Sequence, residues 1–373
     1  MFQNINYNRR MVETLPDQPR KGRGAVTNRS GRYEAQERVS LDDGWRTVET
    51  EAEDGAPPLR TSVTADSSRS IIARNQSPDV PFDRSINPYR GCEHGCIYCF
   101  ARPTHAWLGL SAGLDFETRL FAKFDAASLL EQALAKPAYK PALIAMGTNT
   151  DPYQPVEKRF GITRQVLEVL RRTRHPLGIV TKSDLILRDL DILGAMAERG
   201  LVKVYISVTT LDRGLARIME PRAPAPGRRL AAIRQLRAAG VPTGVMAAPM
   251  IPALNDDELE RILEAAVDAG AVDAGYILLR LPLEIRDLFV EWLGAHFPDR
   301  KARIMKLIRE ARGGRDYESA FGLRMSGRGV YAEALKRRFT LASKRLGLEK
   351  TEWLPDTSQF RPPSPDRDQL SLF

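Results

Sequence analysis

The residues most able to do chemistry in this 373-residue chain lie in one stretch, NPYRGCEHGCIYCFARPTH, which spans residues 87–105 and holds all three cysteines. Cys92, Cys96 and Cys99 are separated by three and then two residues. Three cysteines in one loop cannot form a framework of disulfides, and in a reducing compartment they stay available as thiols. We therefore expect Cys92, Cys96 and Cys99 to bind a metal centre.

The number of thiols favours an iron–sulfur cluster over zinc. A structural zinc site takes four ligands, often as two separated pairs, and this sequence has no second pair of cysteines. His94 lies inside the loop, but so short a loop has difficulty closing a tetrahedron by itself. A [4Fe-4S] cluster is commonly held by four thiolates, so three would leave one iron open to an external chelating molecule. Zinc and a loop without metal remain the alternatives.

Composition sets broad limits on location and partners. No apolar run reaches the roughly 18 residues that cross a bilayer, and the first residues, MFQNINYNRRMVETLPDQPRKG, contain no apolar segment of a signal peptide. We expect a cytoplasmic protein without a membrane partner. The formal net charge is +9, which suits an anionic partner but is also common in proteins that have none.

The segments after the cysteines must position this loop. They alternate between short apolar runs and longer segments of helical period, which predicts βα units around a parallel sheet. With SINPYR, just before Cys92, as the first strand there are six units, so we expect an α/β fold, a partial (β/α)6 TIM-like barrel with its chemistry at the carboxyl ends of the strands. The other expected strands are 142–146, 176–180, 202–208, 243–251 and 276–281, and the expected helices include 162–174, 190–200, 228–240 and 256–270.

The sequence divides into three parts. Residues 1–80 are polar, include the run VETEAEDGAPP and lack a sustained period, so we expect an irregular N-terminal arm. Within this arm KGRG, residues 21–24, is either a phosphate contact or a solvated basic segment. Residues 81–285 form the barrel, and residues 286–373 form a helical C-terminal extension with a frayed tail.

The loop sequence CEHGCIYC follows a strand and has an aromatic residue directly before its last cysteine; it resembles the signature of the radical S-adenosylmethionine (SAM) superfamily. The resemblance implies that the three thiolates hold a [4Fe-4S] cluster and that SAM, the small-molecule cofactor, chelates the remaining iron. An electron from an external donor of the flavodoxin or ferredoxin type would then release a 5′-deoxyadenosyl radical that abstracts hydrogen from a substrate. Tyr98 would lie beside the adenine.

Within that superfamily the sequence is similar to spore photoproduct lyase and to a bacterial family of its relatives. The similarity covers about residues 83–285, through GTNTDPYQPVE, TKSDLILRD, SVTTLD and EPRAPAPGRRL. Spore photoproduct lyases use a further cysteine, at the end of the second strand, as a hydrogen donor, and Thr148 stands at the comparable position. Because an O–H bond is too strong to replace the thiol, we do not expect reversal of thymine dimers by that mechanism.

Polar residues after the second and third strands are candidate ligands of SAM. Thr148, Thr150 and Asp151 in GTNTDP could hold its ammonium group, or they could form a hydrogen-bonded turn that caps the next helix. By the resemblance, Lys182 could reach the carboxylate of SAM. The alternative for Lys182 is a solvated side chain at the start of a helix.

Further candidates follow the fourth strand. Ser207 and Thr209 alternate along VYISVTTLD and share a face, where their hydroxyls suit the ribose or carboxylate of SAM or else bond to the backbone. Glu220 and Glu157 could bind cofactor or substrate, or pair with an arginine on the surface. His105, six residues past Cys99, is a candidate for the substrate side or a structural histidine. We expect ordinary roles for His175 and His296 at helix ends.

Two functions remain in view. The first is a radical SAM enzyme that acts on an unidentified substrate, for which a nucleic-acid base is one candidate. The second is a non-enzymatic iron–sulfur or zinc protein that binds nucleic acid through the N-terminal arm and the basic segment KRRFTLASKR, residues 336–345. Such a helix more simply packs on the barrel. We favour the enzyme, because the cysteine motif and the βα pattern come from different stretches and agree.

Overall fold

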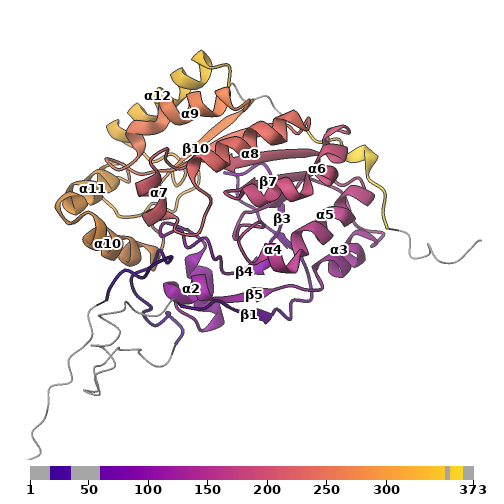
Figure 1. Ribbon diagram of the computed structural model, residues 1–373, viewed down its shortest axis with the longest axis horizontal. Coiled ribbons are helices and arrows are strands. Elements are labelled where there is room, and N and C mark those ends of the chain that lie inside the picture. The colour runs from indigo at the N-terminus through magenta and orange to yellow at the C-terminus, as the bar shows by residue number, and fades with distance from the viewer. Residues whose placement is uncertain (1–16, 35–58, 349–352, 364–373) are drawn as a thin grey trace, which may run out of the picture.

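The computed structural model describes residues 17–34, 59–348 and 353–363, so the polar run at 48–58 and most of the tail lie outside the described residues. The main sheet has seven strands in the order β10-β9-β8-β7-β6-β3-β2 (Figure 1). Neighbouring strands from β3 to β10 pair in parallel, and only β2 is antiparallel. These strands are β2 (Ile72–Arg74), β3 (Arg84–Ile86), β6 (Ile144–Met146), β7 (Leu177–Thr181), β8 (Val202–Ser207), β9 (Thr243–Met250) and β10 (Ala274–Leu278).

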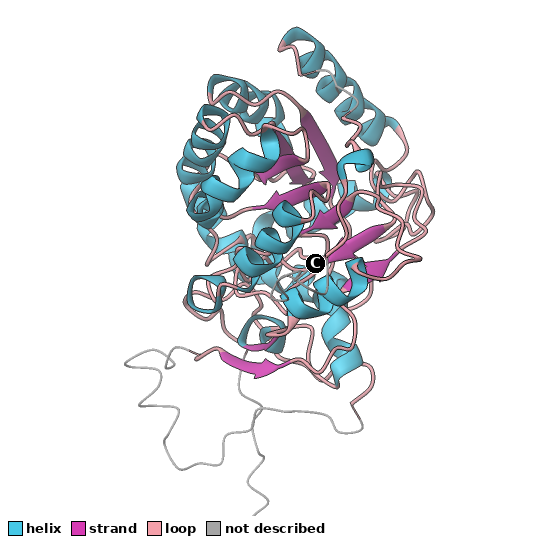
Figure 2. Cartoon of the chain, turned by 90° about the vertical axis from the view of Figure 1, so that its right-hand side faces the viewer, coloured by secondary structure: helices cyan, strands magenta, loops and turns pink. Residues whose placement is uncertain are grey.

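Helices follow the strands and cover the outer side of the sheet (Figures 1 and 2). The expected α/β fold with an open, partial barrel is therefore confirmed, and its six parallel strands agree with the six expected units. No helix in the described part of the chain is both long and apolar enough to cross a bilayer. The helices between strands are α3 (Ala126–Leu134), α4 (Glu157–Phe160), α5 (Ile162–Arg172), α6 (Leu190–Ala197), α7 (Arg213–Met219), α8 (Pro226–Ala238) and α9 (Leu259–Asp268).

Side chains of β8 alternate between an apolar outer face and a polar inner face. Val202, Val204 and Ile206 are fully buried in the core shared with the outer helices. Lys203 and Tyr205 point to the opposite, inner face, because successive side chains of a strand alternate. There both bind Asp273, each at 2.5 Å from its Oδ2 atom. The inner face of β8 thus carries polar groups.

A second sheet supports the cysteine loop. It has three short strands in the order β1-β5-β4, which are β1 (Ser62–Ala65), β5 (Arg119–Ala122) and β4 (Tyr89–Arg90). The sequence pattern did not predict it, because none of its strands exceeds four residues and β1 lies in the polar first part of the chain.

The C-terminal extension contains α10 (Ile285–His296), α11 (Pro298–Glu310) and α12 (Val330–Arg345). Residues 311–329 between α11 and α12, here called the closing strap, contact one edge of the sheet at β10. The Leu278 amide donates to the Met325 carbonyl (2.9 Å), and Arg312 donates to the carbonyl of Leu279 (2.6 Å). Gly327 lies so close to the Leu278 side chain that a Cβ on Gly327 would be 2.6 Å from Leu278 Cδ2.

The closing strap also contacts the opposite edge of the sheet. The amide of Gly322 donates to Asp79 Oδ1 (2.7 Å), and the guanidinium of Arg324 binds both Asp79 and Ser77. Asp79 and Ser77 belong to the connection between β2 and β3. Because β10 and β2 are the two edge strands, the strap bridges the side that an incomplete barrel leaves open.

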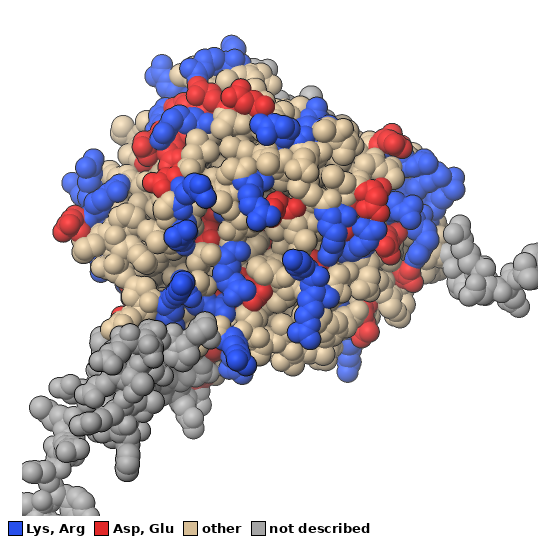
Figure 3. All heavy atoms as spheres, viewed as in Figure 1, with Lys and Arg blue, Asp and Glu red and all other residues tan. Residues whose placement is uncertain are grey.

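The basic C-terminal helix α12 packs on the barrel. Arg338 binds Glu260 of α9 at 2.6 and 2.8 Å, and Arg345 binds Glu264 at 2.5 Å. On the face shown in Figure 3, Lys and Arg side chains are distributed over the whole surface with Asp and Glu among them. The net positive charge therefore does not by itself point to α12 as a binding surface, and the simpler interpretation of this helix is the one the structure supports.

His175, between α5 and β7, is fully buried. Its Nδ1 donates to the Pro176 carbonyl (3.0 Å), and its Nε2 accepts from the Tyr139 hydroxyl (2.7 Å). Burial lowers the pKa of His175 from 6.5 to about 4. The neutral ring is the one that fits this site.

We predict that His175 makes the fold sensitive to mild acid. In the unfolded chain a histidine takes up its proton near pH 6.5, before the buried ring does near 4, so stability is lost as the pH falls through this window. Between pH 7 and 5 the wild type should lose about 2 kcal/mol more unfolding free energy than His175→Gln, by urea denaturation. Equal losses, or an NMR titration midpoint of His175 near 6.5, would contradict this.

Candidate metal centre

The cysteine loop lies at the carboxyl end of β3, with Cys92 and Cys96 buried and Cys99 half-buried. Backbone bonds fix it, since the Cys92 amide donates to Phe116 (2.9 Å) and the Ile97 amide to Met219 at the end of α7 (3.0 Å). Burial, and then nearby negative groups including the other thiols, raises the pKa of Cys92. Burial also raises the pKa of Cys96. Thiolates at these positions therefore require a bound cation, which a metal centre supplies.

A buried arginine holds the loop from beneath. Arg102 and Glu117 are both inaccessible to solvent and form an ion pair at 2.5 Å. The remaining donors of Arg102 point to the carbonyls of Cys96 (2.9 Å), Gly95 (3.1 Å) and residues 112–113 (3.1 and 3.0 Å). This pair orients the loop backbone so that its carbonyls face inward.

The N-terminal segment completes this support. The amides of Gly24 and Ala25 donate to the two carboxylate oxygens of Glu117 at 3.0 and 2.9 Å, and Arg23 donates to its carbonyl (3.0 Å). A Cβ on Gly24 would lie 1.8 Å from the carbonyl oxygen of Gly95. Both interpretations of KGRG, a phosphate contact and a solvated segment, are therefore wrong for Arg23 and Gly24, which are part of the support of the cysteine loop.

Tyr98 is fixed by a buried carboxylate. Its hydroxyl donates to Glu220, which also accepts from the Thr209 hydroxyl (2.7 Å) and pairs with the buried Arg229. Arg229 also donates to the carbonyl of Ser207 (3.2 Å). Glu220 is thus paired with an arginine, as one interpretation held, but inside the protein and beside the cysteine loop rather than on the surface.

Lys182 lies at the same site. Its Nζ is 5.7 Å from the centre of the Tyr98 ring, and its charge acts to lower the pKa of Cys96 against the effect of burial. Within the described residues, no carboxylate lies within ion-pair distance of the Lys182 ammonium group. The ammonium group is therefore available to an anionic ligand between the cysteine loop and the end of β7.

The GTNTDP loop after β6 is largely committed to structure. The Thr150 hydroxyl donates to the Tyr89 carbonyl (3.0 Å). Asp151 accepts from the Thr181 hydroxyl (2.6 Å) and the Lys182 amide (2.8 Å); although burial alone would raise its pKa, the nearby His94 and these bonds lower it to about 2.

Thr148 differs from its neighbours in this loop. Its hydroxyl has only a long bond from the Asn87 amide (3.4 Å) and is half-buried at the rim. Of the three residues predicted in GTNTDP, Thr148 is the one whose side chain stays available to a ligand.

Two other candidates lie away from the site. Glu157 is buried and accepts from the Tyr89 hydroxyl (2.5 Å) and from Arg188 (2.7 Å). Its carboxylate therefore connects parts of the fold and is not free to bind a ligand. His105 is buried between aromatic rings and donates to the Arg119 carbonyl (2.9 Å), and burial lowers its pKa to about 4. The substrate-side role of His105 is therefore wrong, and it is a structural histidine.

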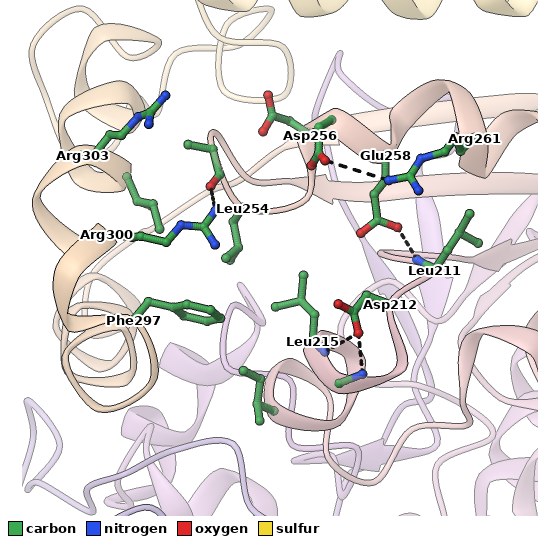
Figure 4. A pocket seen from close by; sticks show the side chains of 15 residues that line it. Leu211, Asp212, Leu215, Leu254, Asp256, Glu258, Arg261, Phe297, Arg300 and Arg303 are labelled. Atoms are coloured by element: carbon green, nitrogen blue, oxygen red, sulfur yellow. Dashed lines mark hydrogen bonds and ion pairs between the residues drawn. The ribbon is translucent and has the colours of Figure 1, made fainter.

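One cavity, of about 810 Å³, is lined partly by α7 and by no residue of the cysteine loop. Leu215 and Ile218 of α7 line it, and Figure 4 shows Arg300 reaching across to the loop at Leu254. Its buried acid Glu258 is already bound by the Leu211 amide (2.6 Å). The polar groups of this cavity thus mainly hold its own walls together.

A second cavity of about 490 Å³ touches the cysteine loop at His94. Its lining includes the basic residues Lys158, Arg222 and Arg228. In the described ranges, no three His, Cys, Asp or Glu side chains meet closely enough to bind one metal ion. The thiolates of an iron–sulfur cluster bind different iron atoms and so need not meet at one point.

Comparisons with known proteins indicate one superfamily. The profile of the Radical SAM superfamily matches residues 86–266. A protein of Mycobacterium tuberculosis described as uncharacterized is 38% identical over 242 residues, which are 64% of this chain and 71% of the relative. A protein of Methanocaldococcus jannaschii, described in the same way, is 30% identical over 173 residues, or 46% of this chain and 62% of the relative.

Solved structures show the same fold. A spore photoproduct lyase mutant is similar with a TM-score of 0.55, over 77% of this chain and 79% of the other, at 17% identity. Another mutant of that enzyme, with bound AdoMet and dinucleoside spore photoproduct, is similar with a TM-score of 0.54, over 76% and 78% of the two chains, at 16% identity. At this identity the likeness shows a shared fold.

We predict that Gly24→Ala weakens the cysteine loop. The added methyl would overlap the Gly95 carbonyl, so backbone must move, and we expect the free energy of unfolding to fall by about 1–3 kcal/mol. Iron content and visible absorbance after anaerobic reconstitution should fall with it. Gly227→Ala, in α8 where a Cβ meets nothing within 4 Å, is the matched control and should keep both. Normal iron content in Gly24→Ala would contradict the proposed support.

Proposed function

The chain belongs to the radical SAM superfamily, and on that premise we propose that it holds a [4Fe-4S] cluster on Cys92, Cys96 and Cys99 and binds SAM beside it. The observation that carries this proposal is the loop itself, in which three closely spaced thiols are buried, fixed through Arg102 and flanked by an unpaired lysine. When bound, the reduced cluster supplies the electron that breaks a carbon–sulfur bond of SAM and gives the 5′-deoxyadenosyl radical.

The residues around the loop suit the parts of SAM. The ammonium group of Lys182 can pair with its carboxylate, and the Thr148 hydroxyl can accept from its amino group. The Tyr98 ring, held by Glu220, offers a face to the adenine. The hydroxyl of Ser207 remains a candidate for the ribose. Thr150, Asp151 and Thr209 then act indirectly, because their side chains hold the loops and Tyr98 in place.

The remaining partners follow from this chemistry. An external donor of the flavodoxin or ferredoxin type would supply the electron, and the cavity at His94, with Lys158, Arg222 and Arg228, offers a basic approach to the outer side of the loop. We also propose a cytoplasmic location, which suits an oxygen-sensitive cluster. Nucleic acid stays one candidate substrate.

We predict that the reconstituted protein cleaves SAM reductively. Anaerobically reconstituted protein with about four irons should form 5′-deoxyadenosine from SAM on reduction with dithionite. Cys96→Ala should lose both the cluster absorbance and this product. Liquid chromatography with mass detection measures the nucleoside, and protein without dithionite is the control. A fully loaded protein that forms no 5′-deoxyadenosine would remove the proposal.

We predict that Lys182 contributes to the affinity for SAM. Lys182→Met removes a charge-assisted bond to SAM of about 1.5–3 kcal/mol, so the dissociation constant of SAM should rise about ten- to a hundred-fold. Iron content should not change, because Lys182 is not a ligand of the metal. Lys158→Met, on the outer side of the loop, should bind SAM as the wild type does by equilibrium dialysis. Unchanged affinity in Lys182→Met would exclude the proposed contact.

A further inference from the structure

A second available cation, Arg280, lies beside the cysteine loop. Arg280 follows the end of β10, and its guanidinium carbon is 5.1 Å from the centre of the Phe100 ring. Phe100 comes directly after Cys99 and is 47% exposed. Arg280 and Phe100 therefore place a positive charge and an exposed aromatic ring next to the proposed cluster.

Arg280 has only weak partners. Its guanidinium approaches the Tyr317 hydroxyl at 3.4 Å and the Met325 sulfur at 3.7 Å, and its buried Nε has no acceptor. Across the described ranges, no carboxylate lies within ion-pair distance of it. Asp79 is near enough to interact electrostatically, but Gly322 and Arg324 already bind its carboxylate. A buried guanidinium donor without an acceptor is unfavourable unless a ligand supplies one.

A second arginine increases the positive charge at this place. Arg312 is fully buried and donates only to backbone carbonyls, among them those of Leu278 (3.0 Å) and Leu279 (2.6 Å). Burial, and then the nearby Arg280, lowers the pKa of Arg312 to about 10. Glu318 offsets part of this effect on Arg312, but the two arginines still repel each other, and a bound anion would relieve this repulsion.

We propose that Arg280 binds an anionic group of the substrate, a phosphate or a carboxylate, beneath the closing strap, while Phe100 contacts an adjoining apolar or planar part. The planar guanidinium offers paired donors that match either oxyanion. The carboxylate of SAM is not the expected ligand, because β7, which leads to Lys182, is three strand spacings or up to ~14 Å from β10. For the identity of its ligand this inference rests on the proposed radical reaction, but anion binding can be measured without that reaction.

The test uses probes that combine a ring with an anion. Phenyl phosphate, benzoate and the neutral benzamide are titrated into the protein by isothermal calorimetry at constant ionic strength. At least one of the two anions should bind more tightly than benzamide, and the preferred anion identifies a phosphorylated or a carboxylate substrate. Arg280→Gln should weaken that binding at least tenfold, and Arg280→Lys should weaken it less. Arg337→Gln, an exposed arginine of α12, is the matched control and should bind as the wild type does.

Three results would overturn the inference. The first is that neither anion binds the wild type more tightly than benzamide, and the second is that Arg280→Gln binds them unchanged. The third is that Arg280→Gln loses SAM binding while its iron content is normal, which would make Arg280 a cofactor ligand. If Arg280→Gln does not fold, Arg280→Lys decides, because equal affinity in that variant would remove the role of the paired donors. Failure to form 5′-deoxyadenosine would count against the radical reaction and leave the anion titration to be judged separately.

Discussion

The cysteine loop depends on the buried ion pair between Arg102 and Glu117. A guanidinium has five N–H donors, and all five from Arg102 find acceptors, four of them carbonyls and one the Glu117 carboxylate. Removing one partner of such a pair typically costs 3–5 kcal/mol, because the other is left buried and uncompensated. The same carboxylate binds Gly24 and Ala25, so one charged pair joins the N-terminal segment, the loop and α2 (Leu114–Thr118).

Three acidic residues in the connections after strands have the same structural role. Asp151 lies shortly after β6, and Glu157 and Glu220 lie further along the connections that follow β6 and β8, where sequence reasoning assigns ligands. In the structure Glu157 and Glu220 are buried and Asp151 is half-buried. Each accepts several bonds, from Thr181, Arg188 or Arg229 among others. These carboxylates hold loops, which leaves the cationic and hydroxyl groups to meet ligands. A site for an anionic or zwitterionic cofactor beside negatively charged thiolates benefits from that distribution.

The barrel could be predicted from sequence because its strands bury one continuous apolar face. Val202, Val204 and Ile206 repeat with a period of two, and the helices between strands repeat with a period near 3.6. The three cysteines were identifiable from their spacing alone. The supporting role of the N-terminal segment could not be predicted. Gly24 permits close contact between two backbones, but in the sequence a glycine among basic and polar residues also fits a flexible arm. For His105 and Glu157 the sequence left two alternatives each, because burial and long-range partners leave no local pattern, and the structure shows a structural histidine and an arginine pair.

The closing strap connects residues that are far apart in sequence, since Gly322 binds Asp79 across 243 positions. The strap is bound along its length, by Arg312, Asp316 and Gly322 among others. The loop that carries the cysteines is held by different residues, Arg102 and Glu117. The printed contacts of the strap thus involve other residues than those that support the cysteines. With the proposed roles of the cysteine loop and of Arg280, this architecture would separate the part that starts the chemistry from the part that selects the molecule. Related proteins could then acquire new substrates while keeping one cofactor.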